Sequence, residues 1–203
     1  MTIATDLTGY YRLHARIYDA TRWSFLFGRQ AILRRIVDRS KPTRILEVGC
    51  GTGRNLLELA KLLPSASLTG LDLSGDMLNI ARQKTAAHSD RVRLVEARYD
   101  EPLGEGYDLV LFSYALSMFN PGWEAALRTA HRELGPNGTL AVVDFHDSPH
   151  GWFERWMKMN HVSMEQHLLP ELKRQFEPLD ARVQKAYFGL WRYVTFLGKP
   201  RVV

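Results

Sequence analysis

Apolar and polar positions along the first three quarters of the chain alternate between two patterns, short apolar runs and longer stretches with helical spacing. Residues 29–40 predict an amphipathic helix whose apolar face carries Ile32, Leu33, Ile36 and Val37. The following segments predict strands at 43–49, 67–74, 91–97, 107–116 and 139–146, and helices at 53–63, 75–86 and 121–134. This alternation is typical of a parallel sheet with helices on both faces.

The last part of the chain has a different pattern. Residues 150–176 have helical spacing with a break expected near Pro170, and two strand-like segments follow, 181–190 and 191–199. A tight connection at Gly189 would let these two strands pair antiparallel. The predicted fold is therefore α/β: a doubly wound Rossmann-like sheet, mostly parallel, with a C-terminal antiparallel hairpin and N-terminal lid helices in front of it.

Length and composition agree with one globular domain over residues 1–203, with an N-terminal lid and helix at 1–40 and the sheet core at 41–203. The single cysteine, Cys50, excludes a disulfide within the chain. No apolar run reaches the length of a signal-peptide core or a membrane span. We therefore expect a cytoplasmic protein, either free or peripheral on the inner face of the cell membrane.

A glycine-rich segment, "EVGCGTGRN" at residues 47–55, lies between a predicted strand and a predicted helix. Gly49, Gly51 and Gly53 would let the backbone turn sharply and approach a ligand closely. Asp72 follows at the end of the second predicted strand, where a carboxylate can accept hydrogen bonds from both hydroxyls of a ribose. The combination predicts a nucleoside-cofactor site; the alternative is that the glycines only turn the chain and Asp72 caps a helix.

The segments around these residues narrow the choice of nucleoside. Arg54 and Asn55 stand where a phosphate-binding loop would need Lys and Ser or Thr, and the glycine spacing is G-x-G-x-G. "ILEVGCGTGRN" and "LTGLDLSGDML" resemble the first and second motifs of the class I S-adenosylmethionine-dependent methyltransferases. The resemblance extends from about residue 10 to the C-terminus, is most specific at 45–77, and implies S-adenosyl-L-methionine as the cofactor.

The resemblance also implies a set of cofactor-binding positions. In that family Glu47 and the glycine loop hold the amino-acid end of the cofactor, Asp72 takes the ribose hydroxyls, and two apolar side chains pack near the adenine. The full set carried over to this sequence is Glu47, Gly49, Gly51, Gly53, Asn55, Asp72, Leu73, Met77, Ala97, Arg98, Ser113 and Tyr114.

Arg98 departs from the family pattern, which often has an Asp there that accepts a hydrogen bond from the adenine amine. An arginine has no acceptor, so we expect a backbone carbonyl, Glu96 or Asp100 to take that part.

The candidates for holding or deprotonating the methyl acceptor are Tyr18, Asp144 and His146, with His150 as the weakest fourth. Tyr18 and Asp19 resemble a Tyr-Asp motif that lines the active site of related small-molecule methyltransferases, and an aromatic ring can face the cationic sulfonium. Asp144 and His146 close a predicted strand, where the acceptor pocket should open. The alternatives are a core aromatic for Tyr18 and strand-end capping for Asp144 and His146; no metal ligand set is expected.

The acceptor is indicated by residues 10–29, "YYRLHARIYDATRWSFLFGR", which are similar to the start of bacterial lipid head-group N-methyltransferases. Trp152 and Trp156 beside Arg155 and Lys158 suit an anionic membrane surface. We expect N-methylation of the amine of a membrane lipid, either diacylglyceryl-homoserine, giving betaine lipid, or phosphatidylethanolamine. The alternative acceptor is a soluble or quinone-like small molecule.

The net charge of +5 also raises the question of a nucleic-acid substrate. No nucleic acid is expected, because the chain shows no appended nucleic-acid-binding module. The fourth predicted strand also ends in "SYAL" rather than the Asn/Asp-Pro-Pro-Tyr/Phe motif often found in methyltransferases of base amines. The oligomeric state is left open.

Overall fold

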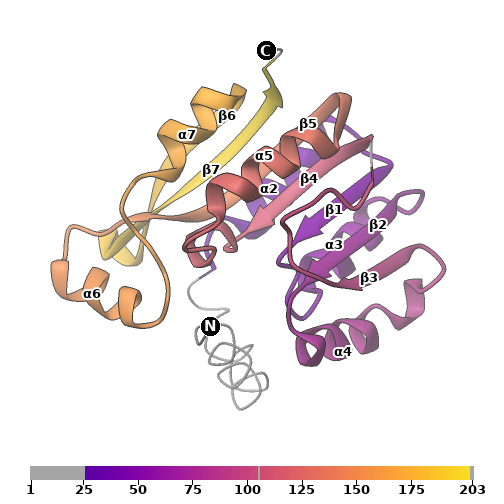
Figure 1. Cartoon of the computed structure of the whole chain (residues 1–203), viewed down its shortest axis with the longest axis horizontal. Coiled ribbons are helices and arrows are strands. Elements are labelled where there is room, and N and C mark those ends of the chain that lie inside the picture. The colour runs from indigo at the N-terminus through magenta and orange to yellow at the C-terminus, as the bar shows by residue number, and fades with distance from the viewer. Residues whose placement is uncertain (1–25, 105, 202–203) are drawn as a thin grey trace.

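A mixed sheet of seven strands forms the centre of the computed structural model, which describes residues 26–104 and 106–201 (Figure 1). The strands are β1 (Arg44–Val48), β2 (Ser67–Asp72), β3 (Val92–Glu96), β4 (Tyr107–Ser113), β5 (Leu134–Asp147), β6 (Phe176–Ala186) and β7 (Trp191–Pro200). The α-helices are α2 (Arg29–Arg39), α3 (Arg54–Leu62), α4 (Gly75–Lys84), α5 (Trp123–Glu133), α6 (Gly151–Met159) and α7 (Leu168–Gln175). Three short 3₁₀ turns are η1 (Ala86–His88), η2 (Leu116–Met118) and η3 (Tyr187–Gly189).

The strand order β3-β2-β1-β4-β5-β7-β6 confirms the predicted fold class. The first five strands are parallel, whereas β7 pairs antiparallel with β5 and with β6. The chain runs outward from β1 to β3 and then returns to place β4 on the other side of β1. In sheets of this kind, ligands usually bind at such a reversal, which here lies at the carboxyl ends of β1 and β4.

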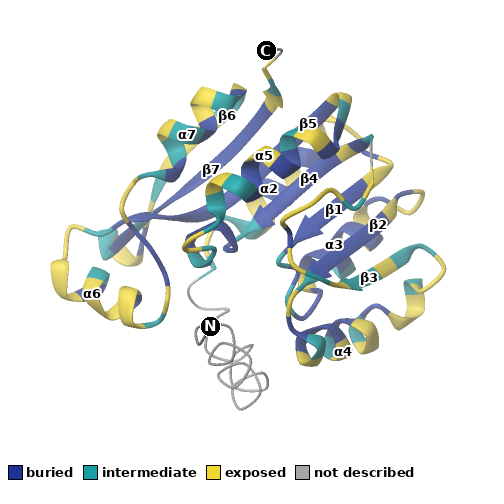
Figure 2. Cartoon of the chain, in the orientation of Figure 1, coloured by how far each residue is buried: buried dark blue, intermediate teal, exposed yellow. Residues whose placement is uncertain are grey.

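Alternate strand residues face two apolar cores, one on each side of the sheet. On one side Ile45 and Leu111 pack with residues of α2, α3 and α4. On the other side Leu46 and Val110 pack with residues of α5 and α7. Figure 2 shows the central strands buried between helices that expose only their outer faces. The parallel strands are therefore rigidly held, and their carboxyl ends form a fixed edge.

The C-terminal third differs from the sequence prediction in where its elements begin and end. Pro170 does not break a long helix; it lies in the first turn of α7, where a missing N–H costs no intrahelical hydrogen bond. The break falls instead at residues 160–167, between α6 and α7. Strand β6 begins at Phe176, five residues earlier than predicted, because that buried side chain joins the core on the α7 side.

Candidate functional site

The glycine loop after β1 takes a backbone conformation that favours glycine, with φ of 70° at Gly49, 52° at Gly51 and 73° at Gly53. The two positions that matter most differ in their surroundings. A Cβ at Gly49 would lie 2.7 Å from the Cβ of Ala115, so this glycine lets the loop pack closely against the end of β4. A Cβ at Gly51 would meet nothing within 4 Å, so the loop is open there to the approach of a ligand.

Asp72 at the end of β2 is tied to this loop. Its Oδ2 accepts a hydrogen bond from the backbone N–H of Gly51 at 2.8 Å, and its Oδ1 accepts one from Ser74 N–H at 2.9 Å. Burial raises the pKa of the Asp72 carboxyl, and the two amides oppose that rise. The side-chain cap of α4 is Ser74, which accepts from the N–H of Met77. Asp72 therefore holds the second strand and the glycine loop in register.

Glu47 lies within β1 and is fully buried. Its Oε1 accepts a hydrogen bond of 2.6 Å from the amide Nδ2 of Asn55, the second residue of α3. Its Oε2 is buried and has no hydrogen-bond partner within the described part of the chain. Burial raises the pKa of Glu47 to about 7. A buried carboxylate oxygen without a donor fits a positively charged ligand group such as the ammonium of a methionine moiety.

The expected adenine contacts lie around the start of α4 and the end of β3. Met77 is buried, Ala97 is half-buried and Leu73 is exposed, so an apolar side chain is available to a ligand on this side. Arg98 projects into solvent and lies 3.7 Å from the equally exposed Asp100. The side chain of Arg98 is thus turned away from the protein, and its assignment to the adenine remains a prediction.

The ends of β4 and β5 meet beside the glycine loop. Ser113 is the last residue of β4, and Tyr114 follows with a φ of 57° and donates its hydroxyl to the carbonyl of Phe27 at 2.7 Å. Asp144 in β5 is completely buried and accepts hydrogen bonds from the backbone N–H of Ser117 at 3.2 Å and of Phe145 at 2.8 Å. Burial raises the pKa of Asp144 to about 6, against the effect of those donors.

His146 lies two residues further along β5. Its Nδ1 is buried without a hydrogen-bond partner within residues 26–104 and 106–201, and burial lowers its pKa. The loop between α6 and α7 covers this region, because Gln166 N–H donates to the carbonyl of His146 at 3.1 Å and Ser163 N–H donates to the carbonyl of Ser117 at 2.9 Å. Asp144 and His146 therefore lie near the end of a strand, as the sequence predicts, but under a covering loop that it does not predict, and their roles stay predictions.

The predicted lid and Arg29 are the two places where the structure and the sequence prediction do not meet. Tyr18 and the predicted lid upstream of residue 26 lie outside the described residues. Arg29 was not predicted as a site residue, yet it donates to Asn55 Oδ1 from Nε at 3.1 Å and from Nη2 at 2.8 Å. No sequence signal identifies this contact, since Arg29 is one of several arginines in its helix.

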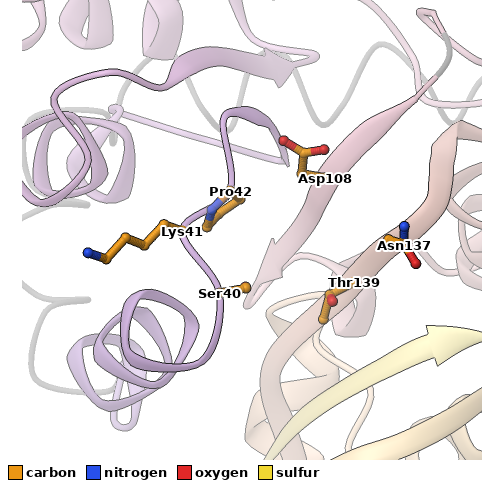
Figure 3. A pocket seen from close by; sticks show the side chains of 6 residues that line it. All are labelled: Ser40, Lys41, Pro42, Asp108, Asn137 and Thr139. Atoms are coloured by element: carbon orange, nitrogen blue, oxygen red, sulfur yellow. The ribbon is translucent and has the colours of Figure 1, made fainter.

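A separate hollow lies at the opposite edge of the sheet, lined by Ser40, Lys41, Pro42, Asp108, Asn137 and Thr139 (Figure 3). These residues stand at the amino ends of β1, β4 and β5. Asp108 accepts there from the N–H and hydroxyl of Thr43 and from the N–H of Arg44. Its hydrogen bonds hold the start of β1 against β4, so this hollow belongs to the scaffold rather than to the cofactor side.

Comparisons with known proteins agree with this geometry. Residues 45–138 match the family described as "Methyltransferase domain". The fold is similar to that of 1,6-didemethyltoxoflavin-N1-methyltransferase from Burkholderia thailandensis, a structure with bound S-adenosylhomocysteine. Its TM-score is 0.74 at 18% identity, over 98% of this chain and 89% of that one. The described residues thus have the Rossmann-like fold of the methyltransferases, and residues 45–138 carry the sequence pattern of that family.

The curated relatives differ from one another in the methyl acceptor for which they are named. A demethylmenaquinone methyltransferase from Thermus thermophilus is 37% identical over 59% of this chain and 56% of its own. A malonyl-[acyl-carrier protein] O-methyltransferase from Priestia megaterium is 28% identical over 65% of this chain and 48% of its own. The chain thus spans about half the length of these relatives. Neither is a lipid head-group N-methyltransferase, the class that residues 10–29 were expected to indicate.

No helix within residues 26–104 and 106–201 has both the length and the apolar character needed to cross a bilayer.

Proposed function

We propose that this protein transfers the methyl group of S-adenosylmethionine to a small-molecule acceptor held at the carboxyl ends of β4 and β5. The observation that carries the proposal is the pair of carboxylates beside the glycine loop. Glu47 has one bare buried oxygen, and Asp72 is fixed by the amide of Gly51. Such carboxylates suit the ammonium and the ribose of one bound cofactor.

The cofactor supplies an activated methyl group whose transfer turns the sulfonium into a neutral thioether. The chain's own contribution is to align an acceptor with that methyl group and to exclude water. An acceptor that carries a proton on the attacking atom must also lose it. Asp144 suits this task, because a carboxylate with a pKa of about 6 is largely ionised at neutral pH and still basic enough to accept a proton.

A quinone-like or other small-molecule acceptor is better supported than a lipid amine. The Thermus thermophilus relative is named for a demethylated quinone, and the Priestia megaterium relative for an acyl group. An enol or phenol acceptor also gives the buried Asp144 a use that a neutral amine does not require. A neutral amine already presents a lone pair and can shed its proton after transfer.

A lipid amine remains the second candidate because of one surface feature. Trp152, Met159 and Phe188 are exposed, with exposed fractions of 64%, 70% and 111%, and Arg155 and Lys158 lie on the same helix as the first two. Exposed rings and thioethers beside cations are typical of a surface that rests on anionic lipid. The same surface would also serve a membrane-dissolved quinone.

Cofactor binding is tested by calorimetry with S-adenosylhomocysteine on the wild type, Asp72→Ala and Asp76→Ala. Asp76 lies in the exposed first turn of α4 and serves as the matched control. We expect the affinity of Asp72→Ala for S-adenosylhomocysteine to fall about a hundredfold or more. The substitution removes the hydrogen bonds that the two ribose hydroxyls would donate to the Asp72 carboxylate. Asp76→Ala should bind like the wild type. Wild-type protein that binds no S-adenosylhomocysteine would overturn the proposal.

The acceptor is then tested with the same preparation and labelled S-adenosylmethionine. One reaction receives a reduced demethylated naphthoquinone in detergent, and the other receives vesicles that contain a primary-amine lipid. Label in the quinone product supports the proposal. Label found only in the lipid would support the second candidate, a lipid amine, instead. Cofactor binding without label in either product would indicate another soluble acceptor.

A further inference from the structure

Three polar side chains link α2 to the end of β1. Arg29, the first residue of α2, donates from Nε and Nη2 to the single oxygen Oδ1 of Asn55. Asn55 in turn donates from Nδ2 to Glu47 Oε1. The contacts join residues that are 26 and 8 positions apart in sequence, so the arrangement depends on the fold and not on a local motif.

The positions of donors and acceptors in these hydrogen bonds fix the orientation of the Asn55 amide. A guanidinium has donors only, so the amide must turn its oxygen toward Arg29. Its NH₂ group then faces Glu47 and occupies one carboxylate oxygen. The second oxygen, Oε2, stays buried and without a donor among the described residues. Without Arg29 the amide would keep only its contact with Glu47 and would lose the second anchor that fixes its position.

We infer that Arg29 is a positioning residue for the amino-acid end of the cofactor: it holds Asn55 so that Glu47 presents one ionised, unpaired oxygen to the cofactor's ammonium. This inference rests on the proposed function, because it assumes that S-adenosylmethionine is the ligand. It goes beyond that function by extending the site from the glycine loop to α2.

The charges around Glu47 give the inference a pH signature. Burial raises the pKa of Glu47 to about 7, the hydrogen bond from Asn55 and the charge of Arg29 lower it, and the charge of Asp72 raises it. Cys50 also faces Glu47, and its pKa is raised, so it stays neutral in this range. Glu47 is therefore partly protonated near neutral pH. An ammonium ligand binds the ionised form, so its affinity should rise as pH rises through about 7.

Two ligands separate the amino-acid end from the rest of the cofactor. S-Adenosylhomocysteine and 5′-methylthioadenosine share the adenosine and the thioether, but only the first carries an ammonium. We expect Arg29→Ala to weaken S-adenosylhomocysteine about tenfold or more, by loss of a charge-assisted contact, and to leave 5′-methylthioadenosine unchanged. Arg34→Ala, at an exposed position of the same helix, is the matched control and should change neither. Retained 5′-methylthioadenosine binding also shows that the variant is folded.

The pH dependence sharpens the test. In the wild type, affinity for S-adenosylhomocysteine should rise between about pH 6 and 7.5, and that for 5′-methylthioadenosine should not. Arg29→Ala should move the rise to higher pH, Arg29→Lys should restore part of it, and Glu47→Gln should remove it. Equal loss of both ligands in Arg29→Ala, or no loss of either, would overturn the inference alone. Wild-type protein that binds neither ligand would overturn the proposed function instead.

Discussion

We call the glycine loop with the carboxyl ends of β1 and β2 the cofactor side, and the carboxyl ends of β4 and β5 the acceptor side. The two sides are built in different ways. On the cofactor side, the carboxylate of Asp72 is held by N–H groups of Gly51 and Ser74, within 21 residues of chain. On the acceptor side, buried polar groups depend on distant segments. Asp147 pairs with Arg192, 45 positions away, and the Ser117 carbonyl accepts from the N–H of Ser163.

This difference explains where the family match ends. The match covers residues 45–138 and stops where β5 begins its regular pairing with β4 at Thr139. Beyond that point lie the rest of β5, the loop between α6 and α7 that covers its end, and the antiparallel strands β6 and β7. The family match thus includes the glycine loop and Asp72, whereas the loop between α6 and α7 lies outside it.

The largest expected effect tests whether the two sides can be separated. Asp144→Asn keeps the shape of the side chain but removes its base. We expect turnover to fall about a hundredfold, the lower range for loss of general base catalysis. Affinity for S-adenosylhomocysteine should be unchanged. Steady-state kinetics on the best acceptor, together with calorimetry, measures both.

The role of Asp144 as a base also predicts the direction in which turnover changes with pH. The Asp144 carboxyl loses its proton as pH rises through about 6, so wild-type turnover should rise through that value and then level off. Burial lowers the pKa of His146, which lies two residues from Asp144, so the difference between wild type and Asp144→Asn is needed to isolate Asp144. Asp38→Asn, at an exposed position of α2, is the matched control. A variant that loses cofactor binding as well would mean that the two sides are not independent.

The next effect compares two glycines within the cofactor side. Gly49→Ala places a methyl group 2.7 Å from the Cβ of Ala115 at a positive φ and should lower the free energy of unfolding by about 3 kcal/mol. Gly51→Ala meets no protein atom and should cost only about 1 kcal/mol, from its positive φ. It should instead lose most of the stabilisation that S-adenosylhomocysteine gives, because its methyl group points into the open space.

Urea unfolding with and without S-adenosylhomocysteine measures both the free energy of unfolding and the stabilisation that the ligand adds. Equal destabilisation of the two variants in the absence of ligand would show that the space beside Gly51 is not open in solution. Full stabilisation of Gly51→Ala by the ligand would place the bound cofactor elsewhere along the loop.

The same contrast decides how much of the molecule the sequence could predict. The glycines, Glu47 and Asp72 were predictable, because a strand, a turn and a helix in succession leave these residues little choice of position. The alternation of strands and helices followed from apolar periodicity, and the antiparallel end followed from the tight connection expected at Gly189, whereas the strand order came only from the structure. Pro170 was misjudged, because a proline that breaks a helix and one that begins a helix look alike in sequence.

Long-range contacts set the limit of that prediction. Arg29 could not be identified, since its partner Asn55 lies 26 positions away and arginines also occur throughout α2. The burial of Asp144 could not be predicted either, because it depends on the loop between α6 and α7 and on the pairing of β5 with β7. A polar residue at a strand end reads the same in sequence whether a loop covers it or solvent does.

The smallest expected effect concerns the tip of the β6–β7 hairpin. Phe188 has φ 56° and ψ 18°, and its side chain is fully exposed. Phe188→Gly removes no packing and relieves the backbone, so the free energy of unfolding should rise by at most about 1 kcal/mol. Its neighbour Tyr187 is the matched control. Its ring contacts Phe27 and Trp191 at centroid distances of 5.0 and 4.8 Å, so Tyr187→Gly should be destabilised.

Co-sedimentation with anionic vesicles then asks what the exposed ring does. If the acceptor side rests on lipid, Phe188→Gly should bind vesicles roughly fivefold more weakly while its stability is kept, since an inserted ring contributes about 1 kcal/mol. Added salt should weaken the wild type as well, because Arg155 and Lys158 act through screened charges. Equal vesicle binding by wild type and Phe188→Gly would remove the hairpin tip from any membrane contact. Any membrane contact would then have to be made by α6, where Trp152 and Met159 are exposed.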